Sequence, residues 1–142
     1  IREIQASTGE SVSLIGWSMG REYAMDASSH LPDITRQVIT LGSPFGDPRG
    51  TSLFTLMRRL SGSKVSIAEQ NFDSWLDKAA APSVPTHVIY SDRDGIVGTD
   101  IARLPHSPLT RHVQVDSSHV AFALNVRALE AVAKALRSRR AV

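Results

Sequence analysis

The chain has 142 residues and a mass of 15.4 kDa, which is the size of one typical domain. Its 42% hydrophobic and 21% charged residues are ordinary for a globular protein and argue against global disorder. The absence of cysteine excludes a disulfide scaffold, thiol catalysis and cysteine-ligated zinc. No apolar run approaches the ~18 residues of a membrane span, and no basic-then-apolar leader follows Ile1, so we expect a cytoplasmic protein.

The basic pI of about 9.4 comes from one end of the chain. From residue 127 onward, five basic residues stand against the single acid Glu130, whereas the rest of the chain has a slight acidic excess. Cations in the last turn of a helix interact favourably with the helix dipole. Since aromatic and basic residues do not interleave anywhere, the charge pattern does not predict nucleic-acid binding.

Four short apolar runs predict β-strands, at residues 12–16, 37–42, 86–90 and 111–115. Runs that are mostly apolar, rather than strictly alternating, fit strands that are covered on both faces. Helical patterns separate these strands, and an alternation of strands and helices is typical of a parallel sheet. We therefore expect an α/β fold with a mostly parallel, four-stranded sheet and flanking helices.

Two helices have clear boundaries in the sequence. The first is predicted at Met19–His30 and is ended by Pro32. The last helix begins at Asn125, a residue type that caps helix N-termini. We expect the buried stripe of this last helix to contain Val126, Leu129, Val132, Ala133 and Leu136.

The segment 45–85 breaks the alternation because it is too long for a simple crossover. It contains two predicted helices, near 52–60 and 67–80. It is either a crossover helix with additional packing or a cap over a pocket. No internal repeat is visible, and the stretch 79–85 is a linker rather than a domain boundary, so we expect residues 1–142 to form a single domain.

The pentapeptide Gly16-Trp17-Ser18-Met19-Gly20 stands where a predicted strand ends and a predicted helix begins. A sharp turn there forces Ser18 into a strained backbone conformation and lifts its hydroxyl clear of the sheet. The two flanking glycines leave room for this turn. The N–H of Met19 lies at the helix start, where it can donate to an oxyanion.

A serine hydroxyl is a weak nucleophile that needs a base, and the base needs an orienting acid. Asp94 follows the third predicted strand, and His119 follows the fourth. The carboxyl ends of parallel strands lie on one edge of a sheet, so Ser18, Asp94 and His119 can converge there. We expect the other histidines to be structural or solvated: His30, His87, His106 and His112.

The order of these residues, serine then aspartate then histidine, is the order found in α/β-hydrolases. The chain resembles the C-terminal half of a lipase- or esterase-like α/β-hydrolase from Ser11 to about Leu136. The motifs that carry the resemblance are GWSMG, VITLGSPF, YSDRDGIV and VDSSHVAFALN. The resemblance is least clear in the segment 47–80.

The resemblance implies that Ser18 is the nucleophile, that His119 is the general base and acid, and that Asp94 orients His119. Asp92 competes with Asp94 for the last role, because two carboxylates so close in a loop cannot both face one imidazole. We favour Asp94 because it precedes Gly-Ile-Val, the usual family context of the acid.

Two features depart from the family pattern. Arg21 stands where many relatives have a small residue, and a cation near a helix N-terminus opposes the dipole. We expect Arg21 to turn to solvent rather than to clamp an anionic substrate. In addition, family members have several strands before the turn that holds the serine, and one of their loops gives the second oxyanion donor. We therefore expect this chain to be a fragment, a truncated gene product or a decayed hydrolase.

The sequence thus predicts a serine hydrolase that cleaves a small-molecule or lipid ester through an acyl-enzyme, without a metal or organic cofactor. One alternative is an acyltransferase that uses the same three residues. The other is a non-catalytic remnant that acts as a binding module. Because the strand with Val12, Leu14 and Ile15 is central in the family's sheet, we also expect self-association through its open edge and poor activity of this chain alone.

Overall fold

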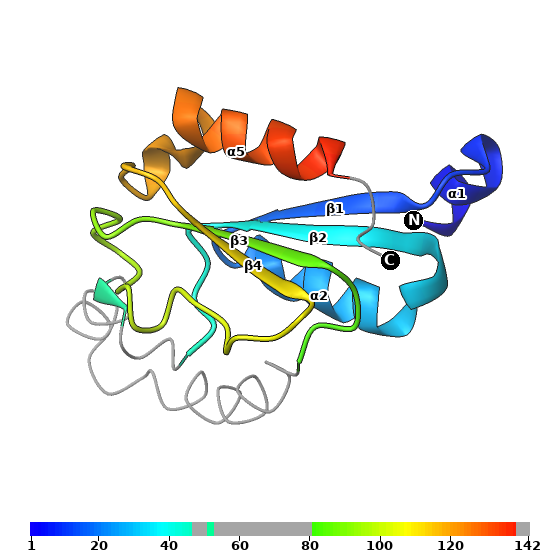
Figure 1. Ribbon diagram of the computed structural model, residues 1–142, viewed down its shortest axis with the longest axis horizontal. Helices are drawn as coiled ribbons and strands as arrows, with labels where there is room; N and C mark the ends of the chain where they lie inside the picture. Colours follow the sequence, from blue (N-terminus) through cyan, green and yellow to red (C-terminus); the bar gives the residue numbers. More distant parts are fainter. Residues whose placement is uncertain (47–50, 53–80, 139–142) are drawn as a thin grey trace, which may run out of the picture.

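The computed structural model describes residues 1–46, 51–52 and 81–138. In this part of the chain, four strands form one sheet in the order β1-β2-β3-β4, and every neighbouring pair is parallel (Figure 1). The strands are β1 (Val12–Trp17), β2 (Thr35–Leu41), β3 (Thr86–Tyr90) and β4 (Thr110–Gln114). The predicted α/β fold is confirmed, and its sheet is entirely rather than mostly parallel.

Two longer helices flank the sheet, α2 (Gly20–His30) and α5 (Val126–Arg137). Three shorter helical segments are α1 (Arg2–Thr8) and the 3₁₀ turns η1 (Pro32–Ile34) and η4 (Val120–Ala123). Helix α2 ends where the sequence predicts, because proline at position 32 lacks an N–H and restricts the residue before it. Helix α1 was not predicted from the sequence. It ends at Gly9, which has a φ of 73°.

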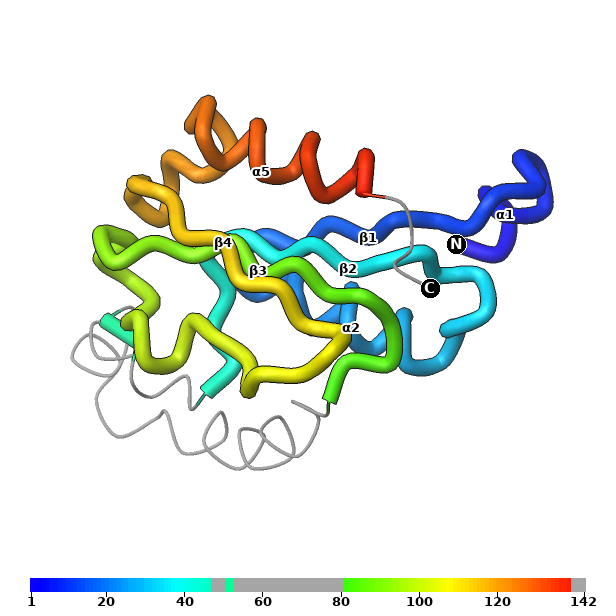
Figure 2. Tube along the Cα trace, in the orientation of Figure 1, coloured from blue at the N-terminus to red at the C-terminus, as the bar shows by residue number. Residues whose placement is uncertain are grey.

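The two longer helices cover opposite faces of the sheet (Figure 2). Side chains alternate along a strand, so neighbouring residues of β2 contribute to different layers. Val38 packs with Ala24 and Met25 beneath α2. Ile39 faces the other way and belongs to the cluster under α5, which also contains Ile89. Burial on both faces accounts for the apolar runs of the two central strands, β2 and β3.

The buried face of α5 differs from the predicted stripe. The residues that pack on the sheet are Ala128, Ala131, Val132 and Ala135. Val126, Leu129 and Leu136 are instead 68%, 48% and 37% exposed. Small side chains let the helix backbone approach the sheet closely, and this placement turns the larger side chains outward. Of the five residues predicted to form the buried stripe, only Val132 is buried.

Asn125 caps α5, as the sequence predicts. Its side-chain oxygen accepts a hydrogen bond from the N–H of Ala128 at 3.1 Å, and its amide donates to the carbonyl of Asp116 at 2.8 Å. We expect Asn125→Ala to lower the free energy of unfolding by about 0.5–2 kcal/mol, measured by chemical denaturation. Glu130→Ala on the exposed side of the same helix is the control. An equal loss in both variants would contradict the cap assignment.

Within the described sheet, β1 and β4 are the edge strands, and they differ in charge. Strand β1 carries no charge, and its Ile15 and Trp17 are 51% and 43% exposed. Strand β4 carries Arg111, a charge of the kind that discourages pairing between molecules. Backbone groups on an uncharged, apolar edge are available to pair with another chain.

We expect the isolated chain to self-associate through β1 and to do so less when Ile15 is replaced by lysine. Size-exclusion chromatography with light scattering measures the change in mass. Tyr23→Lys is the matched control, because Tyr23 is a large, 81% exposed residue on α2 and not on the edge strand. A monomeric wild-type chain, or dissociation by both variants, would argue against the β1 edge.

The predicted cap or crossover segment, with its two helices near 52–60 and 67–80, lies for the most part outside the described residues. At its beginning, Phe45 is buried against Val88 and Leu104. In the described part of the chain, no helix is long and apolar enough to span a bilayer.

Candidate active site

Ser18 occupies the tight turn between β1 and α2. Its φ of 54° makes it the only non-glycine residue with a left-handed backbone among those described. A non-glycine residue rarely adopts this conformation, and such strain concentrates at functional sites. The Ser18 N–H donates to the carbonyl of Leu41 at 2.9 Å. The turn is therefore hydrogen-bonded to the last residue of β2.

The two glycines that flank Ser18 have different roles. A Cβ on Gly16 would lie 2.7 Å from the backbone of Arg21 and from the carbonyl of Gly20, so only glycine fits there. A Cβ on Gly20 would meet no atom within 4 Å. The expectation that both glycines leave room for the turn is therefore wrong for Gly20. Close packing of α2 on the end of β1 constrains only the first glycine.

The structure brings Ser18, Asp94 and His119 together at the carboxyl edge of the sheet. His119 Nε2 lies 2.9 Å from Ser18 Oγ, and its Nδ1 lies 2.9 Å from both carboxylate oxygens of Asp94. Asp94 and His119 are buried, with 4% and 7% of their surface exposed. A carboxylate facing Nδ1 keeps the proton of a neutral imidazole there, so Nε2 accepts from the serine hydroxyl.

Asp94, and not Asp92, faces the imidazole. Asp94 Oδ1 also accepts hydrogen bonds from the N–H groups of Ile96 and Val97, at 3.0 and 2.7 Å. These bonds fix the orientation of the carboxylate. Asp92 lies two residues earlier in the same loop and is exposed.

Gly42 follows β2, and its backbone lies close to the side chains of Asp94 and Phe122. Its φ is 51°, and a Cβ there would lie 2.8 Å from Asp94 Oδ2 and 2.7 Å from the ring of Phe122. Phe122 is completely buried, so it cannot move away easily. The close approach of the backbone at Gly42 sets the position of both side chains.

We expect Gly42→Ala to lower the free energy of unfolding by about 1–3 kcal/mol, because it combines a strained φ with overpacking. Chemical denaturation measures the loss. Gly20→Ala is the matched control: it places a Cβ in open space at the start of α2, where alanine favours the helix. If Gly42→Ala were as stable as Gly20→Ala, the close contact with Asp94 and Phe122 would be unimportant.

Arg21 is buried, with 2% of its surface exposed, so the expectation that it turns to solvent is wrong. Its guanidinium lies over the ring of Phe45, 5.0 Å from the centroid. Burial lowers the pKa of Arg21 to about 10, and the nearby Glu22 opposes this shift. The side chain is still charged at neutral pH. A planar, weakly hydrated cation tolerates burial against an aromatic face, which explains its position.

The other histidines lie outside this hydrogen-bonded group. His30 and His106 are exposed, and His30 is 3.7 Å from Asp26. His87 and His112 belong to β3 and β4. Burial lowers the pKa of both, and neighbouring cations lower it further, so both are neutral at neutral pH.

Two residues near the site were not singled out from the sequence. Trp17 Nε1 donates to the carbonyl of His119 at 3.2 Å, which links the end of β1 to the histidine loop. The hydroxyl of Ser91 accepts from two loop N–H groups. Their signal in the sequence is position: each is a polar group at the carboxyl end of a strand, where the loops of the site begin.

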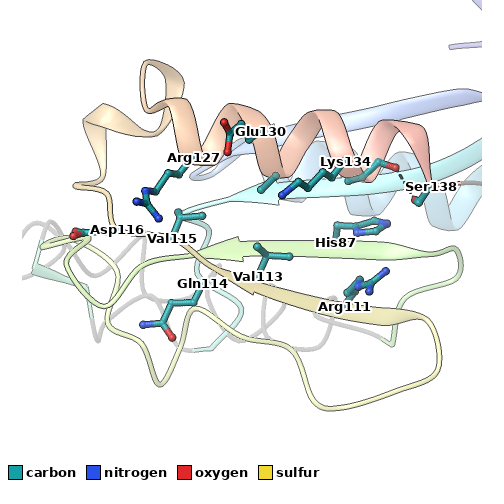
Figure 3. A pocket seen from close by; sticks show the side chains of 12 residues that line it. His87, Arg111, Val113, Gln114, Val115, Asp116, Arg127, Glu130, Lys134 and Ser138 are labelled. Carbon is teal, nitrogen blue, oxygen red and sulfur yellow. Dashed lines mark hydrogen bonds between the residues drawn. The ribbon is translucent and has the colours of Figure 1, made fainter.

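A separate groove of about 460 Å³ lies between β4 and α5 (Figure 3). Its lining includes Arg111 and Val113 from β4, Arg127 and Lys134 from α5, and His87. The groove does not include Ser18, Asp94 or His119. Among the described residues, no group of three or more His, Cys, Asp or Glu side chains could hold a metal ion.

No protein-family model matches the sequence, and no curated protein matches it significantly. Solved structures do resemble the chain. A thermophilic esterase is 20% identical, with a TM-score of 0.62, and the match covers 96% of this chain and 69% of that chain. An α/β hydrolase from the metagenome of sediments of the Mar Chica lagoon, Morocco, is 18% identical, with a TM-score of 0.58. That match covers 95% of this chain and 65% of the other.

The chain has part of the α/β-hydrolase fold. A serine hydrolase from the polyaromatic-hydrocarbon-degrading bacterium Cycloclasticus zankles is also similar, at 15% identity and a TM-score of 0.55. That match covers 95% of this chain and 67% of that one. The chain therefore spans about two thirds of the α/β-hydrolases it resembles. Likeness at these identities shows the fold and not the activity, because one fold hosts many functions.

Proposed function

We propose that the chain carries the catalytic residues of a serine hydrolase that cleaves carboxylic esters through an acyl-enzyme. The observation that supports this most is the continuous line of hydrogen bonds from Ser18 Oγ through His119 to Asp94. The strained backbone of Ser18 supports it independently, because that conformation exposes a nucleophile at the end of a strand. In this proposal the chain corresponds to the C-terminal half of an α/β-hydrolase.

In the proposed reaction, Ser18 Oγ attacks the ester carbonyl while His119 Nε2 takes the hydroxyl proton. The carbonyl oxygen becomes an oxyanion, and the C–O bond to the alcohol then breaks as His119 returns the proton to the leaving oxygen. Water enters next, gives a proton to His119 and attacks the acyl carbon. The bond between that carbon and Ser18 Oγ then breaks as His119 returns the proton to Ser18, which releases the acid. Asp94 stabilises the imidazolium that forms in each half of the reaction.

Met19 supplies one oxyanion donor in this proposal. Its N–H follows the nucleophile directly and lies at the N-cap of α2, where N–H groups have no partner inside the helix. The positive end of the helix dipole adds to the stabilisation of a developing negative charge. Removal of one such donor typically costs about 10²–10³-fold in turnover, which is the size of its expected contribution.

An ester with an apolar portion fits the surroundings of the proposed nucleophile. Trp17 and Met19, on either side of Ser18, are 43% and 44% exposed, and Val120, next to His119, is 70% exposed. Large apolar side chains in such positions favour contact with an apolar substrate. The likeness to an esterase supports the same class of substrate.

A fluorophosphonate probe tests the proposal, because it reacts covalently with an activated serine. We expect a single adduct on Ser18, located by mass spectrometry, and no adduct in Ser18→Ala. The buried Ser43 serves as an internal control, since no histidine activates it in the described structure. No adduct would favour a non-catalytic binding module, and an adduct on another serine would refute Ser18 as the nucleophile. Product analysis with added alcohol then separates hydrolysis from acyl transfer.

A further inference from the structure

The Asp94 loop and the His119 loop leave neighbouring strands, β3 and β4, and must hold their side chains within hydrogen-bond distance. Ser91 lies where the first loop leaves β3, and it is 1% exposed. Its hydroxyl oxygen accepts the N–H of Arg93 at 3.0 Å, within its own loop. The same oxygen accepts the N–H of Ser117 at 3.1 Å, from the histidine loop.

We propose that Ser91 is a positioning residue that holds Asp94 and His119 in register by tying their two loops together at the base. This inference rests on the proposed function for its catalytic consequence, whereas the tie itself is a feature of the fold. A hydroxyl oxygen has two acceptor sites, and Ser91 uses one for each loop. Alanine at this position would leave the buried N–H of Ser117 and the partly buried N–H of Arg93 without this acceptor, so both loops would shift to find other partners.

Besides the bond between the side chains of Asp94 and His119, the loops are joined at two other places. At the surface, Arg93 Nη1 lies 3.3 Å from Asp116 Oδ2, and both side chains are largely exposed. Near the tip, the N–H of His119 donates to the carbonyl of Asp94 at 2.9 Å. An exposed ion pair is weak because water and salt screen it. The bond near the tip joins the two residues whose placement is to be explained, whereas the tie at Ser91 is buried at the base of both loops.

Two variants provide matched controls. Arg93→Gln removes the exposed link between the same two loops without changing the backbone N–H that Ser91 accepts. Ser28→Ala removes an equally buried hydroxyl, one that donates to the carbonyl of Met25 inside α2 and joins no loops. An effect of Ser91→Ala that neither control shares would come from the tie between the loops and not from loss of a surface ion pair or of any buried hydroxyl.

The first measurement does not depend on activity. We expect the Ser117 amide to exchange with solvent about tenfold faster in Ser91→Ala than in the wild type, with no change in Arg93→Gln or Ser28→Ala. We also expect the His119 Nδ1 proton to lose its hydrogen-bonded signal in the proton NMR spectrum. Unchanged exchange at Ser117 would overturn the proposal, whether or not the chain hydrolyses esters.

The second measurement uses a p-nitrophenyl ester in a form of the protein that hydrolyses it. We expect Ser91→Ala to lower kcat by about 10²-fold with KM unchanged, because misplacement of catalytic groups by about 1 Å has effects of this size. Ser91→Thr keeps the hydroxyl and should restore kcat. A kcat equal to that of Ser28→Ala would overturn the proposal. If Ser91→Ala does not fold, Ser91→Cys, which is nearly isosteric but a weak acceptor, is expected to show the same losses.

Discussion

Ser18→Ala and His119→Ala are each expected to reduce ester hydrolysis by about 10³–10⁶-fold in any form of the protein that is active. The serine supplies the atom that becomes acylated, and the histidine moves its proton. Each is within hydrogen-bond distance of the other, so neither can act normally alone. The losses should therefore be of similar size and should not add in the double variant.

Steady-state kinetics on a chromogenic ester measures these losses, with unfolding curves to show that each variant is folded. His30→Ala is the control for the histidine, because His30 is exposed at the end of α2. Turnover near that of the wild type in Ser18→Ala would refute the assignment of the nucleophile. A double variant far worse than either single variant would mean that the two residues act independently.

Asp94→Ala is expected to lower turnover by about 10⁴-fold, whereas Asp92→Ala should have little effect. Asp94 is buried and bonds to His119 Nδ1, while Asp92 is exposed in the same loop. Without the carboxylate, the imidazole loses the partner that selects its tautomer and stabilises its charged form.

The pair of aspartates makes its own control, because both variants remove one negative charge from one loop. The same kinetic assay compares them at several salt concentrations. If Asp92→Ala were the more damaging change, the role of the orienting acid would pass to Asp92. If both were equally harmful, the loss would reflect the charge of the loop and not the bond to His119.

Local pattern in the sequence determined the fold class. The four strands were predicted within two residues of their observed bounds, because short runs rich in β-branched residues and bounded by turn residues are typical of strands. Pro32 and Asn125 marked the end of one helix and the start of another, because their chemistry acts on the nearest backbone groups. Such signals depend on neighbours in the chain and can be read without the fold.

The sequence also predicted that Ser18, Asp94 and His119 lie together, because each follows a predicted strand and because of their order along the chain. The structure has them within hydrogen-bond distance of one another, and their roles in catalysis are the proposal made above. The tie formed by Ser91 could not be foreseen. It depends on the spacing between two loops that leave different strands.

Which side chains of a helix are buried was decided only by the tertiary structure, because the sequence allowed more than one face of the helix to pack on the sheet. The periodicity of α5 allowed a stripe of larger residues, yet the helix rests on Ala128, Ala131 and Ala135, because small side chains let it lie close to the sheet. Arg21 is charged and was expected in solvent, but the approach of α2 to β1 encloses it over Phe45. Burial is a property of packed surfaces, and a residue type constrains it only when no neighbour can satisfy its charge or fill its space.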